Sequence, residues 1–157
     1  MKIKLLAIGK TDDKNLQLLI SSYEARLKHY IKFEIEIIPD LKNVKNLSKP
    51  EQKEKEGELI LKNVTSSDQL ILLDEKGAMH TSKEFSNFMQ KKMNSGIKQM
   101  VMVIGGPYGF SNAVYQKAQG KISLSKMTFS HQMIRLFVVE QIYRAFTILK
   151  NEPYHHD

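Results

Sequence analysis

The chain has 157 residues, no cysteine, and 24 Lys and Arg residues against 17 Asp and Glu, which gives a formal net charge of +7. This length suits one compact domain, and 41% apolar with 26% charged residues is typical of globular rather than disordered proteins. The lack of cysteine excludes disulfides and thiolate nucleophiles and suits a reducing cytosol, while the positive charge favours either a polyanionic partner or simply a soluble surface.

The first half of the chain alternates strand patterns with helix patterns. The opening apolar run ends at Gly9 without a small-residue cleavage site, so it predicts a strand rather than a signal peptide. No apolar run approaches the roughly 20 residues that cross a bilayer. The expected elements, in chain order, are a strand at 3–8, a helix at 14–30, a strand at 33–37, a helix at 49–64 and a strand at 69–74.

The second half continues the alternation. The segment "TSKE" at 81–84 is a capping box, which predicts a helix that starts there. The wholly apolar run at 99–104 predicts a strand buried on both faces. A short helix capped by Ser111 and ending at Gly120, a short strand within 121–129 and a final helix at 131–150 complete the pattern. Five alternations predict an α/β fold with a mainly parallel sheet and helices on its faces.

The segment "VIGGPYGFS", residues 103–111, places three glycines directly after the buried strand. Ligands of open α/β sheets bind outside the carboxyl ends of the strands, so these glycines mark either a tight turn or a ligand contact. The G-G-x-x-G spacing lacks the fingerprints of dinucleotide and triphosphate sites. This absence disfavours a nucleotide-dependent oxidoreductase.

The final helix is apolar nearly all the way round, which predicts a homodimer formed through it. Arg135 and Arg144 are nine residues apart and so lie on opposite sides of this helix. Arg135 shares the face of His131. Arg144 lies one turn beyond Glu140, so it has either a functional role or an ion pair with that residue.

The chain ends in "NEPYHHD", which brings a phenol and two imidazoles close to the last helix. Adjacent histidines rarely direct both rings at one ion, so His155 and His156 do not predict a metal site, and we expect none. His29 and His80 belong to no visible constellation and are expected on the surface.

Three segments together resemble one family: "VIGGPYGF" at 103–110, "ISLSKMTFSHQMIRLFVVEQIYRAFTIL" at 122–149 and the closing "EPYHHD". They are similar to the ribosomal RNA large-subunit methyltransferase H family (RlmH) of the SPOUT class. The resemblance covers the whole chain, including "KIKLLAIGK" near the start and "KEKEGE" at 53–58. The chain departs from the family at Ser130, where many members have proline, and at its last two residues.

The resemblance implies a single SPOUT domain over 1–157, with a C-terminal trefoil knot in a cofactor-binding region at about 70–157. It implies a cytoplasmic homodimer, without metal or membrane, that uses S-adenosylmethionine to methylate N3 of a pseudouridine in 23S rRNA of the assembled ribosome. Carried over by position, the cofactor-binding residues are Leu73, Gly105, Gly106, Leu124, Ser125, Lys126, Met127, Thr128 and Phe129.

For catalysis, Arg144 is the candidate that stabilises charge on the target ring, and Tyr154 would orient the base or relay its proton. His155 is the alternative relay, and His131 is a weaker candidate whose other role is a structural cap. Two alternatives stay open: a methyltransferase that acts on another RNA, and a ribosome-binding factor without catalytic activity.

Overall fold

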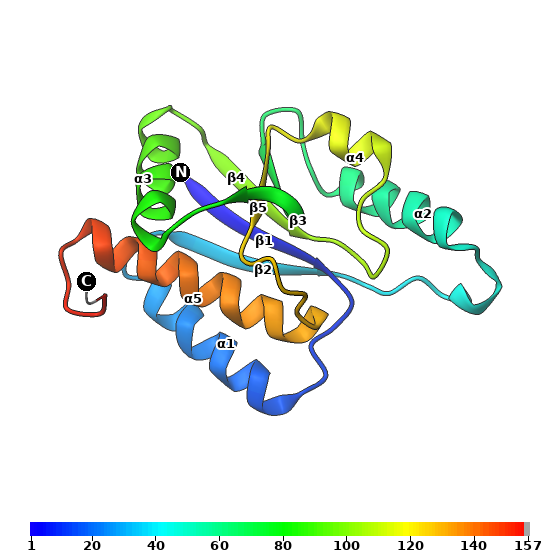
Figure 1. Cartoon of the computed structure of the whole chain (residues 1–157), viewed down its shortest axis with the longest axis horizontal. Coiled ribbons are helices and arrows are strands. Elements are labelled where there is room, and N and C mark those ends of the chain that lie inside the picture. The colour runs from blue at the N-terminus through cyan, green and yellow to red at the C-terminus, as the bar shows by residue number, and fades with distance from the viewer. Residues whose placement is uncertain (156–157) are drawn as a thin grey trace.

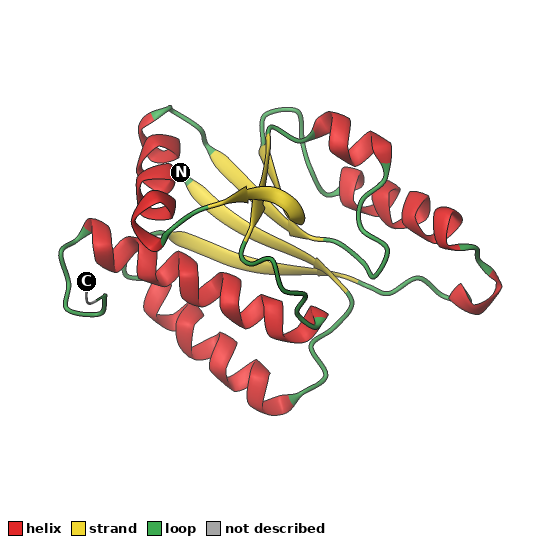
Figure 2. Cartoon of the chain, viewed as in Figure 1, coloured by secondary structure: helices red, strands yellow, loops and turns green. Residues whose placement is uncertain are grey.

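The computed structural model describes residues 1–155 and contains the predicted alternation of strands and helices (Figures 1 and 2). A short 3₁₀ turn, Val44–Asn46, lies between β2 and α2. The elements are β1 (Lys2–Ile8), α1 (Lys14–Leu27), β2 (Lys32–Ile38), α2 (Lys49–Lys62), β3 (Gln69–Met79), α3 (Ser82–Asn94), β4 (Gln99–Ile104), α4 (Asn112–Lys117), β5 (Gly120–Ser123) and α5 (His131–Leu149).

The five strands form one sheet in the order β2-β1-β4-β3-β5, and every neighbouring pair is parallel. The chain first builds outward from β1 to β2 and then continues on the other side of β1 with β4, β3 and β5. All the carboxyl ends therefore meet at one edge of the sheet, which is where α/β proteins bind ligands. The predicted α/β fold with a parallel sheet is confirmed.

Helices cover both faces of the sheet, which explains why the central strands are apolar throughout. Ile3, Leu5 and Ala7 of β1 share one core with residues of α1, α3 and α5. Leu6 and Ile8 point to the other face and share a second core with Ile60 of α2 and Val114 of α4. Figure 1 shows the same division, with α1, α3 and α5 set apart from α2 and α4. No helix in residues 1–155 has the length and apolarity needed to span a membrane.

The predicted caps are present. Thr81 accepts a hydrogen bond from the backbone N–H of Glu84, whose carboxylate accepts one from the N–H of Thr81. Ser111 caps α4, which ends at Lys117 rather than near Gly120. The helix predicted at 14–30 ends at Leu27, where the chain turns into β2. His29 and His80 are exposed, as expected.

Two strand predictions are corrected. β3 continues to Met79, five residues beyond the predicted end, because a bulge between Leu73 and Ala78 lets it keep pairing with β5. Gly77 lies in this bulge, where an added Cβ would be 2.6 Å from the backbone nitrogen of Ile122. β5 contains only Gly120–Ser123, and residues 124–130 form a loop instead of extending the strand.

The central turn of α5 contributes strongly to stability. Ile142 is fully buried in the core shared with α1 and α3, so Ile142→Ala leaves a cavity there. We expect a loss of about 2–5 kcal/mol in the free energy of unfolding, measured by urea denaturation. Leu18→Ala is the control, because Leu18 is 71% exposed and its change should be within about 0.5 kcal/mol. A similar, small effect of both substitutions would contradict the prediction.

Candidate functional site

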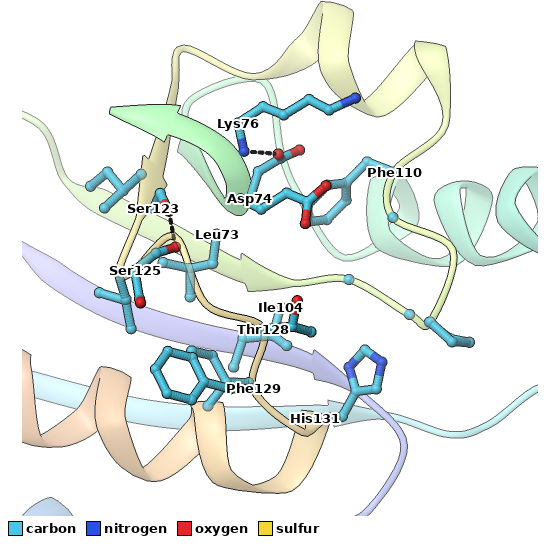
Figure 3. A pocket seen from close by; sticks show the side chains of 18 of the residues that line it. Leu73, Asp74, Lys76, Ile104, Phe110, Ser123, Ser125, Thr128, Phe129 and His131 are labelled. Atoms are coloured by element: carbon cyan, nitrogen blue, oxygen red, sulfur yellow. Dashed lines mark hydrogen bonds between the residues drawn. The ribbon is translucent and has the colours of Figure 1, made fainter. Parts of the chain in front are cut away.

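A cavity of about 450 Å³ lies at the carboxyl ends of β4 and β5 and beside the bulge of β3. The bulged part of β3 and the chain after β4 and after β5 supply its walls, and the first turns of α5 close the lower side (Figure 3). A cavity of this size is typical of small-molecule and cofactor sites. The expected ligand-binding residues line it with the exception of Lys126, which is exposed: Leu73, Gly105, Gly106, Leu124, Ser125, Met127, Thr128 and Phe129.

The glycine loop, residues 105–110, owes its small residues first to its protein neighbours. A Cβ on Gly105 would lie 2.9 Å from the ring of Phe110, and one on Gly106 would lie 2.6 Å from Cδ of Glu56. Gly109 has φ of +78°, a left-handed conformation that favours glycine. The loop therefore presents backbone to the cavity because the ring of Phe110 and the carboxyl group of Glu56 occupy the space that a Cβ would need.

Hydrogen bonds within residues 123–130 stabilise the loop that forms another wall of the cavity. The Ser123 hydroxyl donates to the carbonyl of Ser125 at 2.8 Å, and the N–H of Met127 donates to the Ser125 hydroxyl at 2.9 Å (Figure 3 draws the first). Ser130 caps α5 by accepting from the N–H of Met133 at 3.2 Å. It gives α5 a defined start, since serine is a good N-cap residue.

The cavity also contains polar residues that the sequence interpretation missed, namely Asp74, Glu75, Lys76, Tyr115 and Ser123. Asp74 accepts hydrogen bonds from the N–H of Lys76 and the hydroxyl of Tyr115. Burial and the hydrogen bond to Asp74 raise the pKa of Tyr115 to about 12, so it stays a neutral donor. The missed signal was the position of Asp74 directly after the apolar run 70–73 of β3, next to the ligand-binding edge of the α/β sheet.

His131 and Arg135 have different roles, although they share one face of α5. His131 lines the cavity, and its pKa is lowered by partial loss of solvation and by the nearby Arg135 guanidinium. Arg135 is buried and lies outside the cavity. It donates to the carbonyl of Ile8 at 2.7 Å and to the hydroxyl of Thr11 at 2.9 Å. Arg135 thereby ties the start of α5 to the end of β1.

The three candidate catalytic residues, Arg144, Tyr154 and His155, lie together with Glu140 toward the other end of α5, and we call these four residues the tail cluster. Arg144 donates to Glu140 through Nη2 at 2.6 Å and through Nε at 3.0 Å, so the expected ion pair is present. The guanidinium also lies 4.7 Å from the ring centre of Tyr154, and Nη1 lies 3.4 Å from Nδ1 of His155. The structure thus brings these residues into one contact group.

The protonation states in the tail cluster follow from its contacts. Burial and hydrogen bonds to Tyr23 and Glu140 raise the pKa of Tyr154 well above its ordinary value, and its hydroxyl donates to Glu140 at 3.0 Å. A guanidinium only donates, so Nδ1 of His155 is the acceptor in this contact. Tyr154 is therefore a neutral donor in this arrangement.

The tail cluster is remote from the cavity of its own chain. Ile134 is the cavity residue furthest along α5, and Arg144 follows it by ten residues, about 15 Å of helix. Figure 1 shows the C-terminal segment at the end of α5 away from the loop that precedes it. Within residues 1–155, no group of three or more His, Asp or Glu side chains could hold a metal ion, and His156 lies outside the described residues.

Comparisons with known proteins identify the family of this chain. The model of a family described as predicted SPOUT methyltransferase matches residues 1–155. The chain is 69% identical over 156 residues to ribosomal RNA large subunit methyltransferase H of Flavobacterium johnsoniae, with 99% of each chain covered. It is 64% identical over 157 residues to the protein of that name from Parabacteroides distasonis, with full coverage of both. The chain therefore belongs to the SPOUT methyltransferases and, among them, to the ribosomal RNA large subunit methyltransferase H family.

Proposed function

We propose that this protein, a methyltransferase of large-subunit ribosomal RNA, transfers a methyl group from S-adenosylmethionine to N3 of a pseudouridine in 23S rRNA of the assembled ribosome. Membership of the family supports the rRNA methyltransferase activity. The single observation that carries the finer proposal is the cavity at the strand ends, which the expected cofactor residues surround. We further propose a cytoplasmic, single-domain protein whose loops at the cavity form the trefoil knot that the resemblance implies.

The cavity residues fit this methyl donor. Leu73, Ile104 and Leu124 provide apolar walls that suit an adenine ring, and the glycine loop exposes backbone groups for hydrogen bonds. Asp74 and Glu75 add carboxylates, which suit a ligand that carries a sulfonium and an ammonium group. When bound, S-adenosylmethionine supplies an activated methyl group, so the protein has mainly to position the nucleophile and remove its proton.

The tail cluster has the groups for this task. Methylation forms the N3–CH3 bond, breaks the S–CH3 bond and releases the imide proton. Arg144 would stabilise negative charge that develops on the ring oxygens beside N3. Tyr154, a neutral donor, would orient the base. His155 is then the candidate that accepts the imide proton, once the contact between its Nδ1 and Arg144 is broken.

A homodimer would bring the two sites together, because Arg144 of the tail cluster lies about 15 Å of helix beyond the cavity of its own chain. An isologous pair of α5 helices that run antiparallel places the end of one near the start of the other. An apolar surface that includes Phe129 and Phe137, each 37% exposed, and Met133 supports this arrangement. We therefore propose that the cavity of one chain works with the tail cluster of its partner. A monomeric mass in light scattering at micromolar concentration would contradict it.

The deciding experiment measures transfer of labelled methyl from S-adenosylmethionine to ribosomes that lack the modification, with protein-free rRNA alongside. Label at N3 of a pseudouridine in ribosomes alone supports the proposal. Label at another nucleotide would favour action on a different RNA site. A ribosome-binding factor without activity would give no label and no stabilisation by the cofactor, whereas a cofactor present at 100 times its Kd stabilises its protein by about 2.7 kcal/mol.

Salt should weaken the reaction with ribosomes. The net charge of +7 implies that lysine and arginine contact rRNA phosphates, which releases bound counterions. We expect kcat/KM for ribosomes to fall by about tenfold or more between 50 and 200 mM salt. Binding of S-adenosylhomocysteine, measured by calorimetry over the same range, is the control and should change little. A flat salt profile for ribosomes would contradict a phosphate-dominated interface.

A further inference from the structure

Glu56 is a buried carboxyl group on α2 that the proposed reaction does not use. Its side chain is 3% exposed, and one oxygen, Oε1, accepts a hydrogen bond from Nε2 of Gln52 at 2.8 Å. The other oxygen, Oε2, is buried without a hydrogen-bond partner among the described residues. Burial of a carboxyl group with an unsatisfied oxygen is costly, so its place in the fold calls for an explanation.

The carboxyl group lies directly behind the glycine loop. A Cβ on Gly106 would be 2.6 Å from Cδ of Glu56 and 2.8 Å from Oε1. Gly106 also lines the cavity, whereas Glu56 does not. The loop backbone is therefore held between the carboxyl group of Glu56 and the ligand space.

Gly57, the next residue of α2, packs closely against the other end of the loop. A Cβ on Gly57 would be 2.9 Å from Cβ of Ser111, the residue that caps α4. Ser111 is itself buried. Two consecutive residues of α2 thus contact both ends of residues 105–111, and they support the segment in addition to its internal hydrogen bond from the N–H of Gly109 to the carbonyl of Gly106.

We propose that Glu56 is a positioning residue that holds the glycine loop in the shape that binds the methyl donor. Its carboxyl group fills the space behind Gly106, so the loop cannot move away from the cavity. This inference rests on the proposed function, because it assigns the cavity to a methyl donor. Loss of the support should weaken ligand binding and raise KM for the methyl donor, while kcat at saturation changes little.

The variant Glu56→Gln separates the effect of the side chain's shape from the effect of its charge. Burial, followed by the nearby charge of Asp40, raises the pKa of Glu56, so the folded protein disfavours the ionised form. The folded-state pKa is above the unfolded value, so the stability of the protein with Glu56 falls as the pH rises through that pKa. Glu56→Gln removes this cost and keeps the shape. It should fold at least as well as the parent chain at neutral pH and bind S-adenosylhomocysteine within about threefold of it.

A double-mutant cycle between Glu56 and Gly106 tests the contact. Binding of S-adenosylhomocysteine is measured by calorimetry, with Glu58→Ala as the matched control because Glu58 is exposed on the same helix. We expect Glu56→Ala and Gly106→Ala each to weaken binding by about tenfold, the first by removing the support and the second by colliding with it. In the double variant the collision is gone, so its Kd should stay within about threefold of Glu56→Ala.

Binding by Glu56→Ala equal to the parent chain, or losses that multiply in the double variant, would overturn the inference. If Glu56→Ala does not fold, Glu56→Asp replaces it in the cycle, because the shorter side chain also withdraws the carboxyl group from Gly106. A parent chain that fails to bind S-adenosylhomocysteine would instead overturn the proposed function. Rates of amide hydrogen exchange in residues 105–110, compared between the parent chain and the same variants, would then still decide whether Glu56 holds the loop.

Discussion

Replacing Arg144 with alanine is expected to lower kcat for rRNA methylation by about 100- to 1,000-fold and to leave the Kd for S-adenosylhomocysteine within about twofold. The proposed role of the guanidinium is to contact the ring oxygens of the target base and not the methyl donor, so its removal should change the Kd for the cofactor little. The value of kcat should fall when the guanidinium is removed, because a fixed positive charge beside a developing anion acts mainly in the transition state. Single-turnover kinetics with ribosomes give the rate, and calorimetry gives the binding.

Two further variants separate catalysis from support of the tail. Arg26→Ala is the matched control, because Arg26 lies over the rings of Tyr23 and Tyr143, at 5.3 and 5.7 Å from their centres, without contacting Glu140. It should keep its rate. Tyr154→Phe removes the hydroxyl that donates to Glu140 and should lose methyl transfer while it still binds the cofactor. Wild-type turnover by Arg144→Ala would leave the ion pair with Glu140 as the whole role of that arginine.

Mixing two inactive variants is expected to restore activity, if each site combines the cavity of one chain with the tail cluster of its partner. The first partner is Arg144→Ala, whose cavity is intact. The second is Thr128→Trp, because Thr128 lines the cavity from an exposed loop position and a large ring there should block the ligand. Each alone should fall by about 100-fold or more. An equal mixture after subunit exchange should reach about one quarter of the parent rate, since half the dimers then carry one complete site.

The outcome distinguishes two arrangements of the site. A mixture that stays inactive, although exchange is verified by mass spectrometry of differently tagged chains, would mean that each chain builds its whole site by itself. The tail cluster would then have to reach its own cavity by a large rearrangement of the chain after Leu149. A mixture of Arg144→Ala with Tyr154→Phe is the control, because both lesions lie in the same cluster. Every site in this mixture receives a defective tail cluster, so its rate should not exceed that of the less impaired variant.

The sequence by itself determined the order and type of every major element and the place of the ligand cavity. Local rules suffice for this, because caps such as Thr81 and apolar periodicity act between residues a few positions apart. The parallel sheet then follows from the alternation of strands and helices, and the glycines after β4 mark the edge where ligands bind. The cofactor residues themselves came from the family resemblance rather than from any periodicity.

Only the tertiary structure decided what lies against these residues. Glu56 and Gly106 are 50 positions apart, and no pattern in the chain indicates that one fills the space behind the other. The continuation of β3 to Met79 likewise depends on its partner β5, which is more than 40 residues later. The apolar α5 packs largely against α1 and α3 of its own chain. Contacts of this kind depend on how distant segments cross in three dimensions, so they arise from packing and not from local propensity.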